Sequence, residues 1–135
     1  MTLNFKQISF WGKNCPNFLG IKEHGNRLAL DLTIETCEVF NCFSERDSLN
    51  IFADKTILLT QMTYNFSSED YEERSINDFT ENQEVIEALD KWFKENPIYR
   101  CSQFPYELST EKDSWSEKNF KLDSFEKVIK FLKEQ

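Results

Sequence analysis

Hydrophobic and polar residues alternate along the first half of the chain, and a period of two is typical of β-strands. The clearest case is residues 27–34, in which Leu28, Leu30, Leu32 and Ile34 fall on one face. Less regular runs, rich in β-branched and aromatic residues, occupy residues 3–10, 18–22, 36–43 and 56–66. We therefore predict four or five strands, because such residues suit a pleated and half-buried surface.

Two connections between these strands carry signals of their own. Gly25 and Asn26 follow Glu23 and His24 between two alternating runs, which predicts a hairpin turn. Residues 44–55 are largely polar, and we predict a loop there. Residues 36–43 also fit a helix, but their β-branched and aromatic content favours a strand.

The hydrophobic period changes in the second half and predicts helices. Thr80 and Gln83 match a capping box, with Thr80 as the N-cap. A stripe at helical spacing follows, made of Val85, Ile86, Leu89, Trp92 and Phe93. Asn96-Pro97 predicts the end of this helix. A last helix is predicted from Asp123, with a buried face of Phe125, Val128, Ile129 and Leu132. Ser68 would suit the cap of a further short helix at residues 69–75.

These elements predict an α+β fold, with an antiparallel sheet of four or five strands from the first half packed against two or three helices from the second. A chain of 135 residues is the size of one domain, and we assign residues 1–135 to it. We find neither the apolar core of a signal peptide nor an apolar run near the ~20 residues that a membrane helix needs. We therefore expect a cytoplasmic protein without a membrane contact.

Charge is concentrated in one segment. Residues 67–90 hold nine acidic residues and one arginine, so their net charge of −8 equals the formal charge of the whole chain. Helix formation explains part of this excess, because acids near a helix N-terminus oppose the positive end of its dipole and Glu87 and Asp90 each precede a lysine by four residues. Five acids remain without such an explanation: Glu69, Asp70, Glu72, Glu73 and Asp78.

Aromatic residues accompany this unexplained patch. Tyr71 lies among the five acids, and Trp115 stands alone in a polar stretch further along the chain. Each has a structural interpretation, as an anchor of its segment or as the cover of a small core. Each also suits a binding surface, since tyrosine and tryptophan are frequent at interface hot spots. We predict a partner-binding site at Glu69, Asp70, Tyr71, Glu72, Glu73, Asp78 and Trp115.

No pattern in the sequence indicates catalysis. The three glycines form no phosphate-binding loop, and neither a zinc-protease nor a hydrolase motif occurs. The single histidine, His24, is expected to be a solvated turn residue. Cys15, Cys37, Cys42 and Cys101 contain no Cys-x-x-Cys pair, so we interpret them as reduced thiols rather than a zinc site. We predict a protein that is not an enzyme and that needs no metal and no cofactor.

The charge favours a protein partner over a nucleic acid. With 24 acidic and 16 basic residues, the chain lacks the clustered lysines and arginines that contact phosphates. We expect a small inhibitory protein that binds a basic partner, and in particular an immunity protein that neutralises a bacterial nuclease-type toxin by covering its basic cleft. The first alternative is a phage-type antagonist that mimics DNA against a host defence complex. Further alternatives are a small enzyme with carboxylate or thiol chemistry and a generic adaptor.

Overall fold

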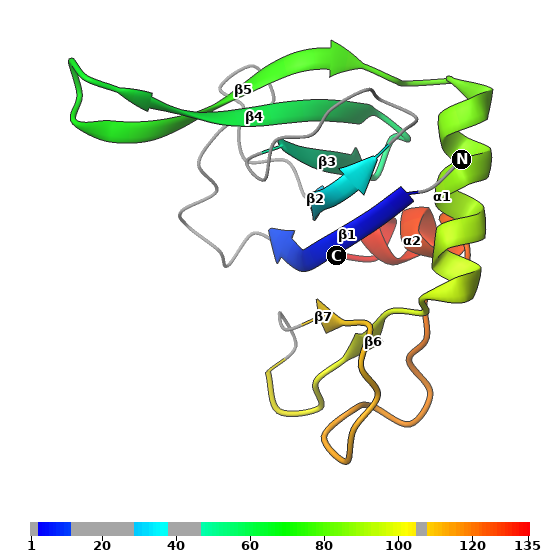
Figure 1. Ribbon diagram of the computed structural model, residues 1–135. Coiled ribbons are helices and arrows are strands. Elements are labelled where there is room, and N and C mark those ends of the chain that lie inside the picture. The colour runs from blue at the N-terminus through cyan, green and yellow to red at the C-terminus, as the bar shows by residue number, and fades with distance from the viewer. Residues whose placement is uncertain (1–2, 12–28, 38–46, 105–107) are drawn as a thin grey trace.

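A computed structural model describes residues 3–11, 29–37, 47–104 and 108–135 of the chain. Five strands form one antiparallel sheet in the order β1-β2-β3-β4-β5, so each strand pairs with its neighbour in the sequence (Figure 1). The strands are β1 (Leu3–Trp11), β2 (Ala29–Cys37), β3 (Asp47–Phe52), β4 (Ile57–Asn65) and β5 (Asp70–Asp78). The predicted α+β fold, with its sheet in the first half, is confirmed.

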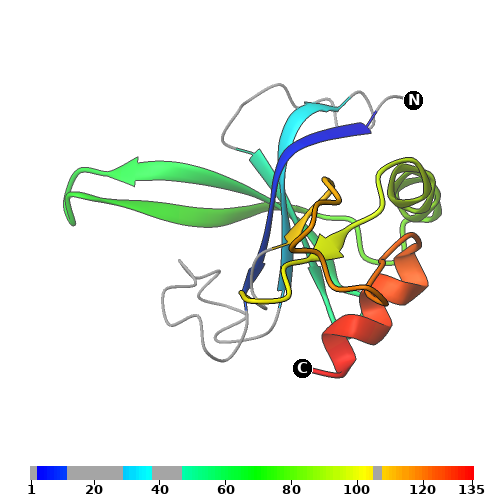
Figure 2. The same cartoon turned by 90° about the horizontal axis from the view of Figure 1, so that it is seen from below.

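Two helices follow the sheet in the sequence, α1 (Gln83–Glu95) and α2 (Phe125–Lys133). Between them lie two short paired strands, β6 (Tyr99–Arg100) and β7 (Leu108–Ser109). Both helices lie on one side of the sheet (Figure 2). Helix α1 contacts β1, α2 contacts β3, and β7 contacts β1 at the sheet edge opposite β5.

The hydrophobic core lies between the sheet and the helices. On the sheet side, Leu30, Leu32 and Ile34 are buried, as their alternation predicts. On the helix side, the two predicted faces are buried as well: Val85, Leu89, Trp92 and Phe93 from α1, and Phe125, Val128, Ile129 and Leu132 from α2. Alternate residues on the other sheet face form a second cluster of Ala29, Phe52 and Leu58. The sheet centre therefore buries apolar side chains on both faces.

The predicted loop at residues 44–55 is wrong, because this stretch contains the central strand β3. All six residues of β3 are buried, including the polar Asp47, Ser48 and Asn50. Asn50 donates a hydrogen bond from Nδ2 to Thr60 Oγ1 at 2.9 Å, and Gln61 Nε2 donates to Asp47 Oδ1 at 3.2 Å. Hydrogen bonds to β4 therefore allow these polar residues to be buried, although residues of this kind are typical of loops.

The predicted short helix at residues 69–75 is also wrong, since these residues lead into and form most of β5, paired with β4.

The N-cap of α1 is Asn82 rather than Thr80, and Asn82 Oδ1 accepts a hydrogen bond from the Val85 N–H at 3.1 Å. Thr80 Oγ1 instead accepts a hydrogen bond from the Ile57 N–H at 3.1 Å. The hydroxyl that was predicted to cap the helix therefore binds the first residue of β4.

The remaining boundaries are close to the predictions. Helix α1 ends at Glu95 before Asn96-Pro97, as predicted. Helix α2 begins two residues after Asp123, and Ser124 is its N-cap. The predicted strand at residues 18–22, the turn at 23–26 and most of the predicted strand at 36–43 lie outside the described residues.

Candidate functional site

Strands β4 and β5 form a two-stranded arm that extends beyond β3. Among the described residues, β3 pairs with β4 as far as Gln61, whereas β4 and β5 remain paired as far as Asn65 and Asp70. We define the arm as residues 62–73. Four residues of strand beyond Gln61 correspond to about 13 Å. In both views the arm points away from the side of the sheet that carries the helices (Figures 1 and 2).

A tight turn closes the end of the arm. It spans residues 66–69, and Glu69 adopts a left-handed conformation with φ of 54°. A glutamate in this region is uncommon, because its Cβ crowds the backbone there. Phe66 is 85% exposed in the same turn. The turn therefore presents an aromatic side chain and an exposed carboxylate at the end of the arm.

The arm carries a negative charge that no basic residue within it offsets. Its twelve residues include Glu69, Asp70, Glu72 and Glu73 but no lysine or arginine. Arg74 is the next residue and pairs with Gln61, where the arm begins. Tyr71 occupies the register position opposite Tyr64. Because the carboxylates share a short segment, they act on an approaching charge as one concentrated source of potential.

The structure thus brings together five of the seven predicted site residues, Glu69, Asp70, Tyr71, Glu72 and Glu73. Asp78 lies at the other end of β5, about 26 Å from Asp70 along an extended strand. Its Oδ1 accepts a hydrogen bond from the Thr80 N–H at 2.8 Å and so shapes the connection to α1. Asp78 is therefore separate from the arm.

Trp115 is also separate from the arm. It is 54% exposed and lies between β7 and α2, in the part of the chain that neighbours β1. Its N–H donates to Asp113 Oδ1 at 2.8 Å, and its carbonyl accepts from the Ser102 N–H at 2.7 Å. Strands β1 and β5 are opposite edges of the sheet, so four strand spacings, about 19 Å, separate this region from β5.

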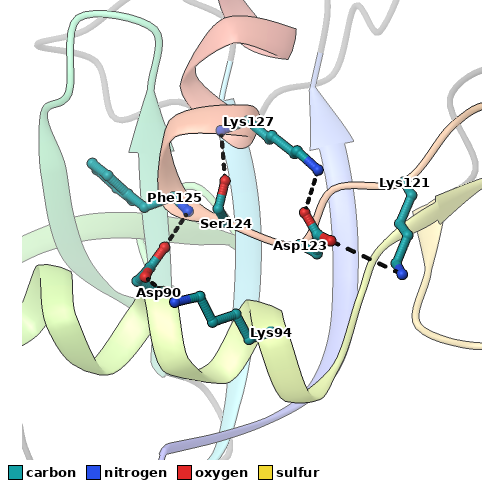
Figure 3. Close-up of polar contacts among 7 residues, drawn as sticks. All are labelled: Asp90, Lys94, Lys121, Asp123, Ser124, Phe125 and Lys127. Carbon is teal, nitrogen blue, oxygen red and sulfur yellow. Dashed lines mark hydrogen bonds and ion pairs between the residues drawn. The ribbon is translucent and has the colours of Figure 1, made fainter.

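Carboxylates near the helices have structural partners. Asp90 Oδ1 accepts a hydrogen bond from the Phe125 N–H at the start of α2, at 3.0 Å, and Asp90 Oδ2 lies 3.3 Å from Lys94 Nζ (Figure 3). Ser124 Oγ caps the Lys127 N–H at 3.1 Å. The predicted pairing of Asp90 with Lys94 is therefore present, and Asp90 also joins the two helices.

Asp123 has a comparable role before α2. Its Oδ1 lies 2.6 Å from Lys127 Nζ, and its Oδ2 lies 3.9 Å from Lys121 Nζ (Figure 3). The hydrogen bond from Lys127 lowers the pKa of Asp123, aided by the charges of Lys127 and Lys121 and opposed by partial burial. This acid is therefore compensated locally.

A surface groove of about 700 Å³ between α1 and α2 is a second candidate site. Its charged lining is mixed: Lys55, Lys91, Lys94, Glu87, Asp90 and Glu126. The one hydroxyl in the lining belongs to Ser124, which caps α2. The groove gives no reason to prefer one ligand over another.

The residues considered for metal or thiol chemistry are only partly described. Cys101 is a half-buried free thiol on the connection between the helices. His24, Cys15 and Cys42 lie outside the described residues. Among the side chains that the structure describes, no group of three or more histidines, cysteines and acids is placed to hold a metal ion.

Comparison with known proteins found no similar protein. The chain matches no protein-family model, no curated protein and no solved structure. Within the described ranges, no helix has the length and apolar character needed to span a membrane.

Sequence reasoning missed two features of the site: Phe66 at its end and the hairpin that carries it. The signal available was the Ser67-Ser68 pair between two polar and aromatic runs, which suits a turn.

Proposed function

We propose that this chain is a small inhibitory protein that binds a basic partner through its arm, and specifically an immunity protein for a nuclease-type toxin. The observation that carries the proposal is the set of four carboxylates on a projecting two-stranded segment without a basic residue. A nuclease needs a positively charged cleft to hold phosphates. A narrow acidic projection complements such a cleft in both charge and shape.

The arrangement of the other acids supports a local contact. Asp90 and Asp123 are engaged with Lys94 and Lys127, and Glu117 Oε2 accepts from Arg100 Nη2 at 2.8 Å. A DNA mimic would need uncompensated carboxylates spread over a long surface, whereas the arm extends only about 13 Å beyond the β3 pairing. We therefore favour the insertion of one acidic element into one cleft over imitation of a duplex.

Charge also affects the rate at which the two proteins meet. Oppositely charged surfaces raise association rates from about 10⁵–10⁶ M⁻¹s⁻¹ towards 10⁸–10⁹ M⁻¹s⁻¹ at low salt. Fast capture matters to a cell that must neutralise its own toxin before that toxin acts. The concentration of charge on a projecting segment suits this requirement.

The test begins with a pull-down from the producing cell, with the full chain as bait. We expect to recover a basic nuclease whose activity is lost on adding one equivalent of the chain. A second bait carries Glu69→Lys, Asp70→Lys, Glu72→Lys and Glu73→Lys together and is expected to fold but not to bind. A matched control reverses four exposed acids elsewhere: Glu87, Glu95, Glu111 and Glu134. Equal binding by the two reversed chains at low salt would show that the arm is not the contact.

A further inference from the structure

Strand β5 is an edge strand of the sheet in the part of the chain that the structure describes. Among the described strands it has one neighbour, β4, whereas the opposite edge strand, β1, is contacted by β7. An edge strand directs alternate backbone N–H and C=O groups outward, where they are ready to pair with another strand. The outer side of β5 therefore offers hydrogen-bonding groups that the described sheet does not use.

The usable part of this edge is its first six residues. Residues 70–75 pair one-to-one with β4, from Asn65↔Asp70 to Thr60↔Ser75. The register then shifts between Leu59 and Thr60, opposite Asn77 and Ser75. Because such an irregularity disrupts the ladder and bends the strand, it limits regular pairing to residues 70–75.

The charges of this stretch indicate what kind of strand it accepts. Residues 70–75 include Asp70, Glu72, Glu73 and Arg74. A second copy paired antiparallel would bring acids close to acids, which is unfavourable for cross-strand neighbours. A strand rich in lysine or arginine would instead place opposite charges beside one another. The same acids thus deter self-association and favour a basic strand.

We infer that the outer edge of residues 70–75 binds a basic strand of the partner by main-chain pairing, which extends the sheet by one strand. This inference rests on the proposed function in taking the partner to be basic. It adds the mode of contact: backbone hydrogen bonds hold the partner, and the acids of the arm select it.

The test uses the full chain and a synthetic peptide of alternating lysine and threonine with blocked ends. A second peptide has the same sequence, but the amides of two adjacent central residues are N-methylated. Adjacent methyl groups block both edges of the peptide strand and leave its charge unchanged. We expect the unmethylated peptide to bind at least about tenfold more tightly, since pairing would add backbone hydrogen bonds. A peptide of alternating glutamate and threonine is expected not to bind.

Amide hydrogen exchange of the chain supplies the second measurement. Peptide binding is expected to slow exchange at every other residue of 70–75, because only outward N–H groups gain partners. Equal affinity of the two lysine peptides, protection without alternation, or no binding of either peptide would each overturn the edge-pairing inference. If the nuclease from the pull-down still binds the arm in those cases, the proposed function stands and only the mode of contact is wrong.

Discussion

Asp90 joins the two helices, and its replacement by alanine is expected to destabilise the fold. One oxygen of Asp90 accepts the Phe125 N–H, a group at the start of α2 that no residue within the helix can satisfy. The other oxygen pairs with Lys94. Phe125 itself is buried, so its N–H is poorly placed to find water when the carboxylate is removed.

The size of the effect follows from these contacts. Loss of a side-chain acceptor at a helix N-terminus costs about 0.5–2 kcal/mol. The Asp90 side chain is 35% exposed and that of Lys94 is 68% exposed, so their ion pair adds no more than about 0.5 kcal/mol. We expect Asp90→Ala to lower the free energy of unfolding by about 1–2 kcal/mol. Asp90→Asn keeps an acceptor oxygen and is expected to cost about half as much.

Urea denaturation followed by circular dichroism measures these changes. With a slope of about 2 kcal/mol per molar urea, Asp90→Ala should move the midpoint by about 0.5–1 M. Glu87→Ala is the matched control, since Glu87 is exposed on the same helix and accepts only a 3.3 Å hydrogen bond from Gln83. If the two alanine variants unfold at the same urea concentration, the bond to Phe125 does not join the helices as described.

Three further predictions concern stability and charge. Asn50→Val and Thr60→Val are each expected to cost about 1–3 kcal/mol, because each removes the buried hydrogen bond that the two side chains share. The double variant is expected to cost less than the sum of the two, since that bond can be lost only once; additive urea midpoints would contradict this. Lys55→Gly and Glu69→Gly each relieve a positive φ and should stabilise the chain by up to about 1 kcal/mol, but only Glu69→Gly should also slow capture of the partner. Because the folded pKa of Asp123 is lowered, its contribution to stability is present above its ordinary value of 3.8 and is lost as the pH falls through the folded pKa. Asp123→Asn should therefore be less stable than the natural chain at neutral pH and equally stable in strong acid; a difference that persists in strong acid would refute this assignment.

Local signals predicted the helices well. The spacing of Leu89, Trp92 and Phe93 identified α1, and Asn96-Pro97 marked its end. The N-cap was misplaced by two residues because Thr80 is engaged by the Ile57 N–H, a contact between segments 23 residues apart. Contacts over such distances in the sequence leave no trace in helical periodicity.

The strands β3 and β5 were missed for related reasons. Asp47 and Asn50 are typical of loops, and they lie in a buried strand because Gln61 and Thr60 are their hydrogen-bond partners. The acids of β5 are typical of the first turn of a helix, but this segment pairs with β4, with Tyr71 opposite Tyr64. The sequence located the acidic segment, but its projection depends on the pairing of β4 with β5 continuing past Gln61. It could not exclude Asp78 and Trp115 from the site. Asp78 is far from the arm because residues 70–78 form an extended strand rather than a helix, and the distance of Trp115 depends on the strand order.

The most direct test of the proposed function is the association rate constant of the recovered partner with two reversed chains, measured at low and high salt. One chain has the four arm acids reversed, and the other has Glu87, Glu95, Glu111 and Glu134 reversed, so their net charges are equal. If the arm enters a basic cleft, the arm-reversed chain should associate at least about tenfold more slowly than the control at low salt, and the gap should narrow at high salt. Equal rate constants for the two chains at low salt would contradict a role for the arm in binding.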